Sequence, residues 1–379
     1  MHDAGIMIIA GEASGDMHGA NMVAAMKQIN PELTFCGIGG SELLKQGMEP
    51  LYDASQIAVV GLSEVFSHLK DIRQAMRNID DRLRRQHPRL LILIDFPDFN
   101  LMTAKKAKRY DIPVFYYISP QVWAWRSGRV KKIARLVDKM AVILPFEKDF
   151  YHDKGVEVEF VGHPLMDTVR PAMAKEDFLA KHAITPSGKV VGILPGSRKK
   201  EISAMLPTFL EVAKMLAADL PDLTFVCPLA PTLTLKDLQQ NGLDTTQLNI
   251  KVISGDRYDL MAACDAVMAV SGTVTLELAI LNVPMVVAYR VSPLTYFLGR
   301  RLIKVKYASL VNLVAGKEVV PEMLQHAMTS ENIYRHLLQL LTQEKKYKEM
   351  RQELLKVVKK LGGAGASQRA AQLALSMIR

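Results

Sequence analysis

The stretch LILIDFPDFN, residues 91–100, predicts the fold of the chain. Four apolar residues lead into Asp95, and a proline then precedes Asp98, which is the pattern of a buried strand followed by a helix start. Such near-continuous apolar strands are typical of parallel sheets that helices cover on both faces. The two carboxylates are therefore expected at the carboxyl end of a strand, where ligands bind to open α/β sheets.

The same alternation of short apolar segments and helix-length segments occurs in two runs along the chain. The expected strands are residues 6–10, 33–38, 90–95, 114–118, 139–144, 158–162, 190–194, 223–228, 250–254, 266–270 and 284–289. A proline-containing linker near residues 162–175 separates the two runs. We expect an α/β protein with Rossmann-like domains at 1–165 and 166–344, a tail that is only helical from about residue 320, and helices at 345–379 that complete the first domain.

The composition is that of a folded protein with an anionic partner. Hydrophobic residues make up 49% and charged residues 23%, which excludes a disordered chain. The 48 Lys and Arg exceed the 39 Asp and Glu, and the net charge of +9 favours a phosphorylated substrate, an acidic lipid surface or a nucleic acid. The three cysteines lie far apart and indicate neither a disulfide framework nor a zinc site. Since neither a signal peptide nor a run of about 18 apolar residues stands out, we expect a cytoplasmic protein that does not cross a membrane.

The loop GEASGD, residues 11–16, follows the first expected strand. Its glycines and serine suit close approach to a ligand, but its acids would repel a pyrophosphate. It is interpreted as a loop that binds the hydroxyls of a sugar, with Glu12, Ser14 and Asp16 as candidates. The alternative is that Ser14 or Asp16 simply caps a helix.

Three alternatives are open for the carboxylates of Asp95 and Asp98. One of them can act as the general base that takes a proton from an attacking hydroxyl. The pair can also bind a metal, or both can be structural. Farther along, SPQVWAWR at 119–126 places Trp125 beside Arg126, a combination that suits stacking on a sugar ring and holding a phosphate. Packing of at least one tryptophan in the core is the alternative.

Two loops of the second run have the composition of phosphate-binding loops. Gly196, Ser197 and Arg198 lie between a strand and a helix, although the Walker spacing is missing.

The second of these loops contains Ser271, Gly272 and Thr273. Glu277 follows Thr273 by one helical turn and can accept hydrogen bonds from both hydroxyls of a ribose, unless it is merely an exposed helical glutamate.

Taken in order, these motifs resemble those of the lipid-A-disaccharide synthase family, which are glycosyltransferases of the GT-B architecture. The motifs are GEASGD, IDFPDFN, SPQVWAWR, LPFEKDFY, GHP, LPGSR, SGTVTLE, PMVVAYR and SLVNL. The resemblance covers essentially the whole chain. It implies two Rossmann-like domains facing a cleft, the first on the acceptor and membrane side and the second binding the UDP-sugar.

The resemblance also implies a reaction and its residues. The family transfers 2,3-diacylglucosamine from UDP-2,3-diacylglucosamine to the 6-hydroxyl of 2,3-diacylglucosamine 1-phosphate (lipid X). By motif, Asp98 is the base, Arg198 contacts the diphosphate and Glu277 contacts the ribose. Asn312 of SLVNL falls at a position important for activity and is expected to contact the UDP donor, although Val311 stands where relatives often have proline. No metal and no cofactor are expected, because a base and a cationic contact to the leaving group suffice for inversion.

Because the implied substrates carry acyl chains, we expect the protein to bind an anionic membrane as a peripheral protein on the cytoplasmic face of the inner membrane. Residues 60–88 combine an apolar stripe with basic flanks, typical of a helix in a membrane interface or of one that faces the core. The expected membrane contacts are Val65, Phe66, Leu69, Ile72, Arg73 and Arg77. A homodimer is left open.

Two other functions fit parts of the sequence. A UDP-sugar epimerase of the same fold would use similar nucleotide loops, but it gives no reason for the amphipathic segment. A non-catalytic basic protein would bind a membrane or a nucleic acid. Nucleic acid is not an expected partner, because aromatic residues are only 7% and the arginines are divided among separate motifs.

Overall fold

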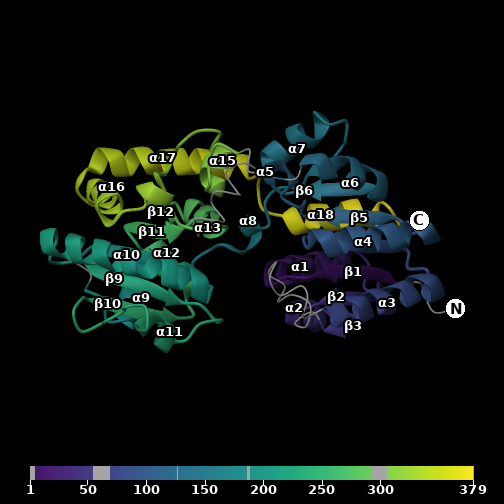
Figure 1. Ribbon diagram of the computed structural model, residues 1–379, viewed down its shortest axis with the longest axis horizontal. Helices are drawn as coiled ribbons and strands as arrows, with labels where there is room; N and C mark the ends of the chain where they lie inside the picture. The colour runs from purple at the N-terminus through teal and green to yellow at the C-terminus, as the bar shows by residue number, and fades with distance from the viewer. Residues whose placement is uncertain (1–4, 54–68, 126, 186–187, 292–304, 379) are drawn as a thin grey trace. The chain divides into compact units, whose positions relative to one another are not determined.

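The computed structural model describes residues 5–53, 69–125, 127–185, 188–291 and 305–378. The chain forms two compact units, the first comprising Met1–Asp167 with Gly362–Arg379 and the second Thr168–Leu361. Each unit contains one parallel sheet with helices packed against it (Figure 1). Within the described ranges, no helix is both long and apolar enough to span a bilayer.

The first unit contains a seven-stranded sheet in the order β3-β2-β1-β4-β5-β6-β7. Its strands are β1 Ile6–Ala10, β2 Phe35–Gly39, β3 Glu49–Asp53, β4 Leu90–Ile94, β5 Val114–Tyr117, β6 Lys139–Val142 and β7 Glu159–Phe160. Every neighbouring pair is parallel. All residues of β1 and β4 are buried because both faces of the sheet are covered.

Helices of the first unit lie on both faces of this sheet. They are α1 Ala13–Ile29, α2 Ser41–Lys45, α3 Leu69–Gln86, α4 Pro97–Ala107, α5 Val122–Trp125, α6 Val130–Leu136, α7 Pro145–His152 and α18 Ala366–Leu375, with 3-10 turns at Lys108–Tyr110 and Ser127–Arg129. Helices α3, α4 and α6 supply apolar side chains to one core with the sheet. Helices α1 and α18, which are far apart in sequence, lie side by side (Figure 1). The short helix α8, Leu165–Thr168, leads into the second unit.

The second unit contains a six-stranded parallel sheet in the order β10-β9-β8-β11-β12-β13. Its strands are β8 Val190–Leu194, β9 Thr224–Leu229, β10 Ile250–Ser254, β11 Ala266–Val270, β12 Met285–Tyr289 and β13 Glu322–Leu324. Its helices are α9 Lys175–Lys181, α10 Lys199–Asp219, α11 Leu235–Gln239, α12 Arg257–Ala263, α13 Val274–Ile280, α15 Leu310–Ala315, α16 Ser330–Thr342 and α17 Glu344–Lys360, with a 3-10 turn at Gln325–Ala327. Helix α16 packs on α10 and on the sheet at β11 and β12.

All eleven expected strands are present, and the described ranges contain two further strands that were not expected, β3 and β13. Strand β3 lies at a sheet edge and is largely exposed, so it lacks the apolar run of a buried strand. Strand β13 has three residues, and the expectation of a tail with helices only is wrong there.

The chain also returns to the first unit later than residue 345, the position expected from the sequence. Helix α17 belongs to the second unit, because Leu354 and Val357 are buried where α17 packs on α13, α15 and α16. Only Gly362–Arg379 joins the first unit.

Candidate active site

In each sheet the strand order reverses beside the first strand, and the predicted loops lie at these reversals. In the first unit, residues 11–16 follow β1 and residues 95–98 follow the adjacent strand β4. In the second unit, residues 195–198 follow β8 and residues 271–273 follow the adjacent strand β11. Since ligands of open α/β sheets bind at such reversals, each unit has one candidate site made of two loops.

The two loops of the first unit pack directly against each other. A Cβ atom on Gly11 would lie 2.4 Å from Cγ of the Phe96 ring, so only glycine fits there. Phe96 has φ 46° and ψ 57°, and Asp95 before it has φ 46°, both in the left-handed region. The Tyr116 hydroxyl and the Asn100 side chain both donate to the Asp95 carbonyl, at 2.6 and 2.5 Å. These contacts stabilise a strained turn that fixes where α4 begins.

The two aspartates of this turn have different surroundings. Asp98 lies in the first turn of α4, its side chain is 71% exposed, and one carboxylate oxygen is 2.6 Å from the Arg129 guanidinium. Asp95 is mostly buried, and burial, reinforced by the nearby Glu12, raises the pKa of its carboxyl to about 6. Asp98 is thus the more accessible carboxylate of the pair.

The loop after β1 divides into exposed and structural parts. Glu12 and Ser14 are exposed. Asp16 is buried, and its carboxylate accepts hydrogen bonds from the backbone N–H groups of Gly40, Glu42 and Leu43 at 2.7 to 3.1 Å. Those groups lie at the start of α2, so Asp16 caps that helix, which corrects its expected role as a sugar contact.

One of the two tryptophans belongs to the core, as the alternative stated above anticipated. Trp123 is buried, and its indole N–H donates to Glu147 at 3.1 Å. Glu147 also accepts from the N–H groups of Ile143 and Leu144 at 3.2 and 2.9 Å, and burial raises the pKa of its carboxyl to about 7. Trp125 ends α5, but its side chain and Arg126 lie outside the described residues.

The loop at Gly196, Ser197 and Arg198 differs from the expected phosphate cradle. The Glu201 carboxylate accepts from the N–H groups of Ser197 and Arg198, at 2.9 and 3.2 Å. Gly196 has φ +111°, and a Cβ there would lie 2.4 Å from the same carboxylate. Two backbone donors expected for the ligand are therefore used inside the loop, whereas the Arg198 side chain is 77% exposed and can reach an anion.

The loop at Ser271–Gly272–Thr273 precedes α13, which carries Glu277. Ser271 donates its hydroxyl to the Ala308 carbonyl at 2.8 Å, and Thr273 is exposed. Glu277 is buried, which rules out an exposed helical glutamate, and its carboxylate pairs with the Arg257 guanidinium.

Asn312 is fully buried, and four hydrogen bonds occupy its amide. Its Oδ1 accepts from the N–H groups of Val319 and Val320, at 2.7 and 3.0 Å. Its Nδ2 donates to the Val320 carbonyl at 2.9 Å and to the Glu322 carboxylate at 2.8 Å. Asn312 therefore fastens the segment before β13 to α15, and this geometry does not support the direct donor contact expected from the sequence.

Glu322 extends this network to the second candidate loop. Its carboxylate also accepts from the Ser309 hydroxyl and N–H at 2.7 and 2.9 Å and from the Ala308 N–H at 2.8 Å. The Ala308 carbonyl in turn accepts from Ser271. Asn312 is thus linked to Ser271 through Glu322 and residues 308–309.

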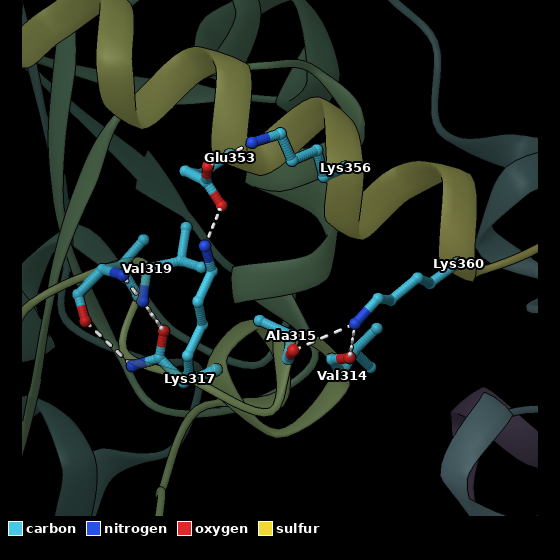
Figure 2. A network of polar contacts seen from close by, with 9 residues as sticks. Val314, Ala315, Lys317, Val319, Glu353, Lys356 and Lys360 are labelled. Carbon is cyan, nitrogen blue, oxygen red and sulfur yellow. Dashed lines mark hydrogen bonds and ion pairs between the residues drawn. The ribbon is translucent and has the colours of Figure 1, made fainter.

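The other end of α15 is held by α17, as Figure 2 shows. The Lys360 ammonium donates to the carbonyls of Val314 and Ala315 at 3.3 and 2.9 Å, which satisfies the end of the helix. Lys317 pairs with Glu353 at 2.6 Å (Figure 2). The helix that carries Asn312 is therefore fixed at both ends.

The apolar stripe of α3 serves the first unit itself. Ala75, Ile79 and Leu83 are buried in its core, and Ile72 and Met76 are partly buried against that core. The membrane contact expected of Ile72 stays a prediction. These apolar residues recur at helical spacing because one face of α3 packs on the sheet. Arg73 and Arg77 are exposed, whereas Val65, Phe66 and the Leu69 side chain lie outside the described residues.

Four polar groups of these sites were not chosen from the sequence: Glu147, Glu201, Arg257 and Glu322. Of these, Glu201 had a local signal, since a glutamate three residues after a helix N-cap is typical of a capping box. Glu147 has the same local signal, because it lies three residues after Leu144, the N-cap of α7. Arg257 and Glu322 act through contacts that are more distant in sequence. In the described ranges, no group of three or more His, Cys, Asp or Glu is arranged to hold a metal ion.

Comparisons with known proteins agree over nearly the whole chain. A family model described as lipid-A-disaccharide synthetase matches residues 6–377. The lipid-A-disaccharide synthase of Geobacter metallireducens is 48% identical over 98% of this chain and 97% of its own length. That of Myxococcus xanthus is 41% identical over 98% and 97%, respectively.

Solved structures show the same fold at low identity. UDP-GlcNAc 2-epimerase from Neisseria meningitidis superposes with a TM-score of 0.66 at 15% identity, over 98% of this chain and 99% of the other. The glycotransferase of kitacinnamycin superposes with a TM-score of 0.67 at 14% identity over 100% of both chains. The expected GT-B-like fold, two parallel α/β sheets, is confirmed. The family match and the full-length relatives show that the chain belongs to the lipid-A-disaccharide synthase family and is a glycosyltransferase of lipid A biosynthesis.

Proposed function

We propose that this glycosyltransferase moves 2,3-diacylglucosamine from its UDP donor to the 6-hydroxyl of 2,3-diacylglucosamine 1-phosphate. The bond from the donor C1 to the diphosphate oxygen breaks, and a bond from C1 to the acceptor O6 forms with inversion. The hydroxyl proton passes to a base, and UDP leaves. The products are a β-1,6-linked disaccharide 1-phosphate and UDP. Membership of the family supports this choice over an epimerase or a binding protein.

The observation that carries the proposal is the setting of Asp98. Its accessible carboxylate lies at the reversal of the first sheet, and Arg129 holds it in place. Such a carboxylate can accept the proton of an attacking hydroxyl as the bond to C1 forms. Asp95 is mostly buried in the turn below and is assigned to shaping that turn.

On the donor side, we assign Arg198 to the diphosphate and Glu277 to the ribose. The exposed guanidinium of Arg198 can stabilise the negative charge that develops on the leaving diphosphate. Glu201 positions this loop, and Gly196 and Ser197 shape it.

The second loop, at Ser271, Gly272 and Thr273, borders the same ligand. Asn312 acts indirectly, because it binds Glu322, which holds residues 308–309 against Ser271. The first unit accordingly binds the acceptor, with Glu12 and Ser14 as exposed candidates and Trp125 and Arg126 as predictions from the sequence.

The test is release of UDP from UDP-2,3-diacylglucosamine in detergent micelles with EDTA, with and without the acceptor. We expect release that requires the acceptor, persists in EDTA and falls by about 10²- to 10⁴-fold in Asp98→Ala. Asp95→Asn is the matched control in the same turn and should retain activity. Equal release by wild type and Asp98→Ala would exclude Asp98 as the base, and loss of activity in EDTA that magnesium restores would exclude a metal-independent mechanism.

We further propose that the protein binds the cytoplasmic face of the inner membrane peripherally. The support is the exposed basic side of α3, with Arg73 and Arg77, together with substrates that carry acyl chains. Co-sedimentation with anionic vesicles should fall when both arginines are changed to glutamate. In the control variant, Lys345 and Lys348 on α17, which are also exposed, are changed to glutamate. This variant should bind the vesicles as wild type does. Equal binding by both variants would exclude α3 as the contact.

A further inference from the structure

Glu277 is a buried carboxylate whose charge is compensated by an arginine from another helix. Its side chain is 4% exposed and lies on α13, whereas Arg257 begins α12 and is 52% exposed. The guanidinium contacts Oε2 of Glu277. An isolated buried carboxylate is strongly unfavourable, so this contact is what permits an ionised side chain at position 277.

The start of α12 is fixed independently of Glu277. Asp256, with φ 43°, precedes Arg257 and pairs with Lys181 and with His182. One turn later, the Asp259 carboxylate accepts from the N–H groups of Ala172 and Met173, at 2.6 and 2.8 Å. All these residues belong to the second unit, so Arg257 projects from an anchored helix end.

A carboxylate that binds a ribose must be ionised, because only then do both oxygens act purely as acceptors for the 2′ and 3′ hydroxyls. Burial raises the pKa of the Glu277 carboxyl, and the charge and hydrogen bond of Arg257 oppose this rise. In the described part of the chain, the electrostatic partners of Glu277 are Arg257 and Tyr258, both on α12. The pKa of Tyr258 is raised by burial and by Glu277, so its phenol is neutral and cannot replace Arg257 as a counterion.

We propose that Arg257 is a positioning residue that keeps Glu277 ionised and oriented as the double acceptor for the ribose of the nucleotide donor. The inference rests on the ribose contact proposed above for Glu277, and it adds the residue on which that contact depends. Arg257 acts through Glu277, so its removal affects recognition of the ribose hydroxyls more than recognition of the rest of the nucleotide.

The experiment compares the binding of UDP and of 2′,3′-dideoxy-UDP by isothermal titration calorimetry, from about pH 5.5 to about pH 8.5. Wild type should prefer UDP by about 10- to 100-fold from neutral pH to the alkaline end of this range. Arg257→Met should lose most of this preference near neutral pH and regain part of it at the alkaline end, as Glu277 ionises. Arg257→Lys, which keeps the positive charge, should retain an intermediate preference. Arg335→Met removes an exposed Arg–Glu pair elsewhere in the second unit and should behave as wild type does.

The outcomes separate this inference from the donor role of Glu277. If wild type binds the two nucleotides equally, the ribose contact itself is wrong, and this inference falls with it. A wild-type preference that Arg257→Met leaves unchanged overturns only the role of Arg257. If Arg257→Met binds both nucleotides more weakly by the same factor, Arg257 has a general structural role, and its proposed role in ribose recognition is also overturned. Should Arg257→Met fail to fold, as judged by circular dichroism, the same comparison is decided by Arg257→Lys and Arg257→Gln.

Discussion

The Asp98 carboxylate lies 2.6 Å from the Arg129 guanidinium, and this ion pair joins two segments that are separate in the sequence. Asp98 comes from the turn after β4, and Arg129 ends the 3-10 turn after α5. Because Asp98 is largely exposed, the pair adds little to the free energy of folding. Its consequence is geometric: Arg129 restricts where the carboxylate of the proposed base can point.

Replacing Arg129 should therefore slow catalysis without unfolding the protein. We expect Arg129→Met to lower kcat by about tenfold, since a loosely held base reacts from the correct geometry less often. Arg129→Lys should recover part of this loss. The measurement is the initial rate of UDP release, combined with a thermal melt that should shift little. Arg84→Met, which removes another exposed ion pair of the first unit, is the control.

A double-mutant cycle shows whether Arg129 acts through Asp98. In the Asp98→Asn background, Arg129→Met should cause no further loss of kcat, because the group that it orients is already absent. Additive losses would mean that Arg129 has a separate role, such as contact with the acceptor phosphate.

The buried carboxyl of Asp95 leads us to expect a stability effect whose size depends on pH. The pKa of its carboxyl is raised from 3.8 to about 6, chiefly by burial, so the folded state favours the protonated form. The protonated Asp95 carboxyl therefore contributes to the stability of the folded state below the unfolded pKa, and this contribution is lost as pH rises through about 6. Asp95→Asn should be more stable than wild type by about 2 kcal/mol near pH 7.5, and this gain should vanish near pH 4. Asparagine also tolerates the left-handed backbone at this position.

Urea unfolding at the two pH values measures this difference. A gain that is the same at both values would rule out titration of Asp95 as the cause. Loss of transferase activity in Asp95→Asn would instead indicate that Asp95 takes part in the chemistry.

Replacement of Arg198 should lower kcat/KM strongly and change the stability of the protein little. Its side chain is 77% exposed, so Arg198→Met should leave the melting temperature nearly unchanged. We expect kcat/KM for the UDP donor to fall by about 100-fold, because the leaving diphosphate loses a cationic contact. Arg198→Lys should recover only part, since lysine cannot form a bidentate contact. Steady-state kinetics with a melt for each variant are the measurement, and a kcat/KM within about twofold of wild type would exclude the diphosphate contact.

The sequence located the buried strands and the loops of the candidate sites, but not the partners of the side chains in those loops. Strands such as β4 are recognisable because they are apolar on both faces, whereas the edge strands β3 and β13 are not fully buried and lack that signal. The loop positions follow from parallel topology alone. The capping of α2 by Asp16 and the pairing of Glu277 with Arg257 depend on contacts distant in sequence, which local patterns do not specify.

A substitution at Asn312 tests whether this residue positions the Ser271 loop or contacts the ligand directly. Asn312→Ala removes four buried hydrogen bonds and leaves donors and acceptors unpaired, so the free energy of unfolding should fall by about 2 to 4 kcal/mol. UDP affinity should fall as well, because the support of the Ser271 loop is loosened. Chemical unfolding and calorimetry with UDP are the measurements. Weaker UDP binding at unchanged stability would contradict the positioning role and favour a direct contact.

The buried histidines of the first unit predict sensitivity to acid. Burial lowers the pKa of His163 to about 3, with a further contribution from His18, and burial also lowers the pKa of His18 to about 4 despite the nearby Asp167. Because the unfolded value is 6.5, the neutral form of His163 contributes stability that is complete above about 6.5 and is lost as pH falls through the folded value.

In His163→Asn, the amide oxygen can still accept the Leu165 N–H that Nδ1 accepts in wild type at 3.2 Å, but the side chain no longer titrates. Between about pH 7 and about pH 5, wild type should lose about 2 kcal/mol more stability than this variant. Urea unfolding across that range is the measurement, and His87→Asn, at an exposed histidine, should follow the wild-type slope. If the free energies of unfolding of wild type and His163→Asn fall in parallel with decreasing pH, another group causes the acid sensitivity. A buried neutral His163 requires the two curves to diverge.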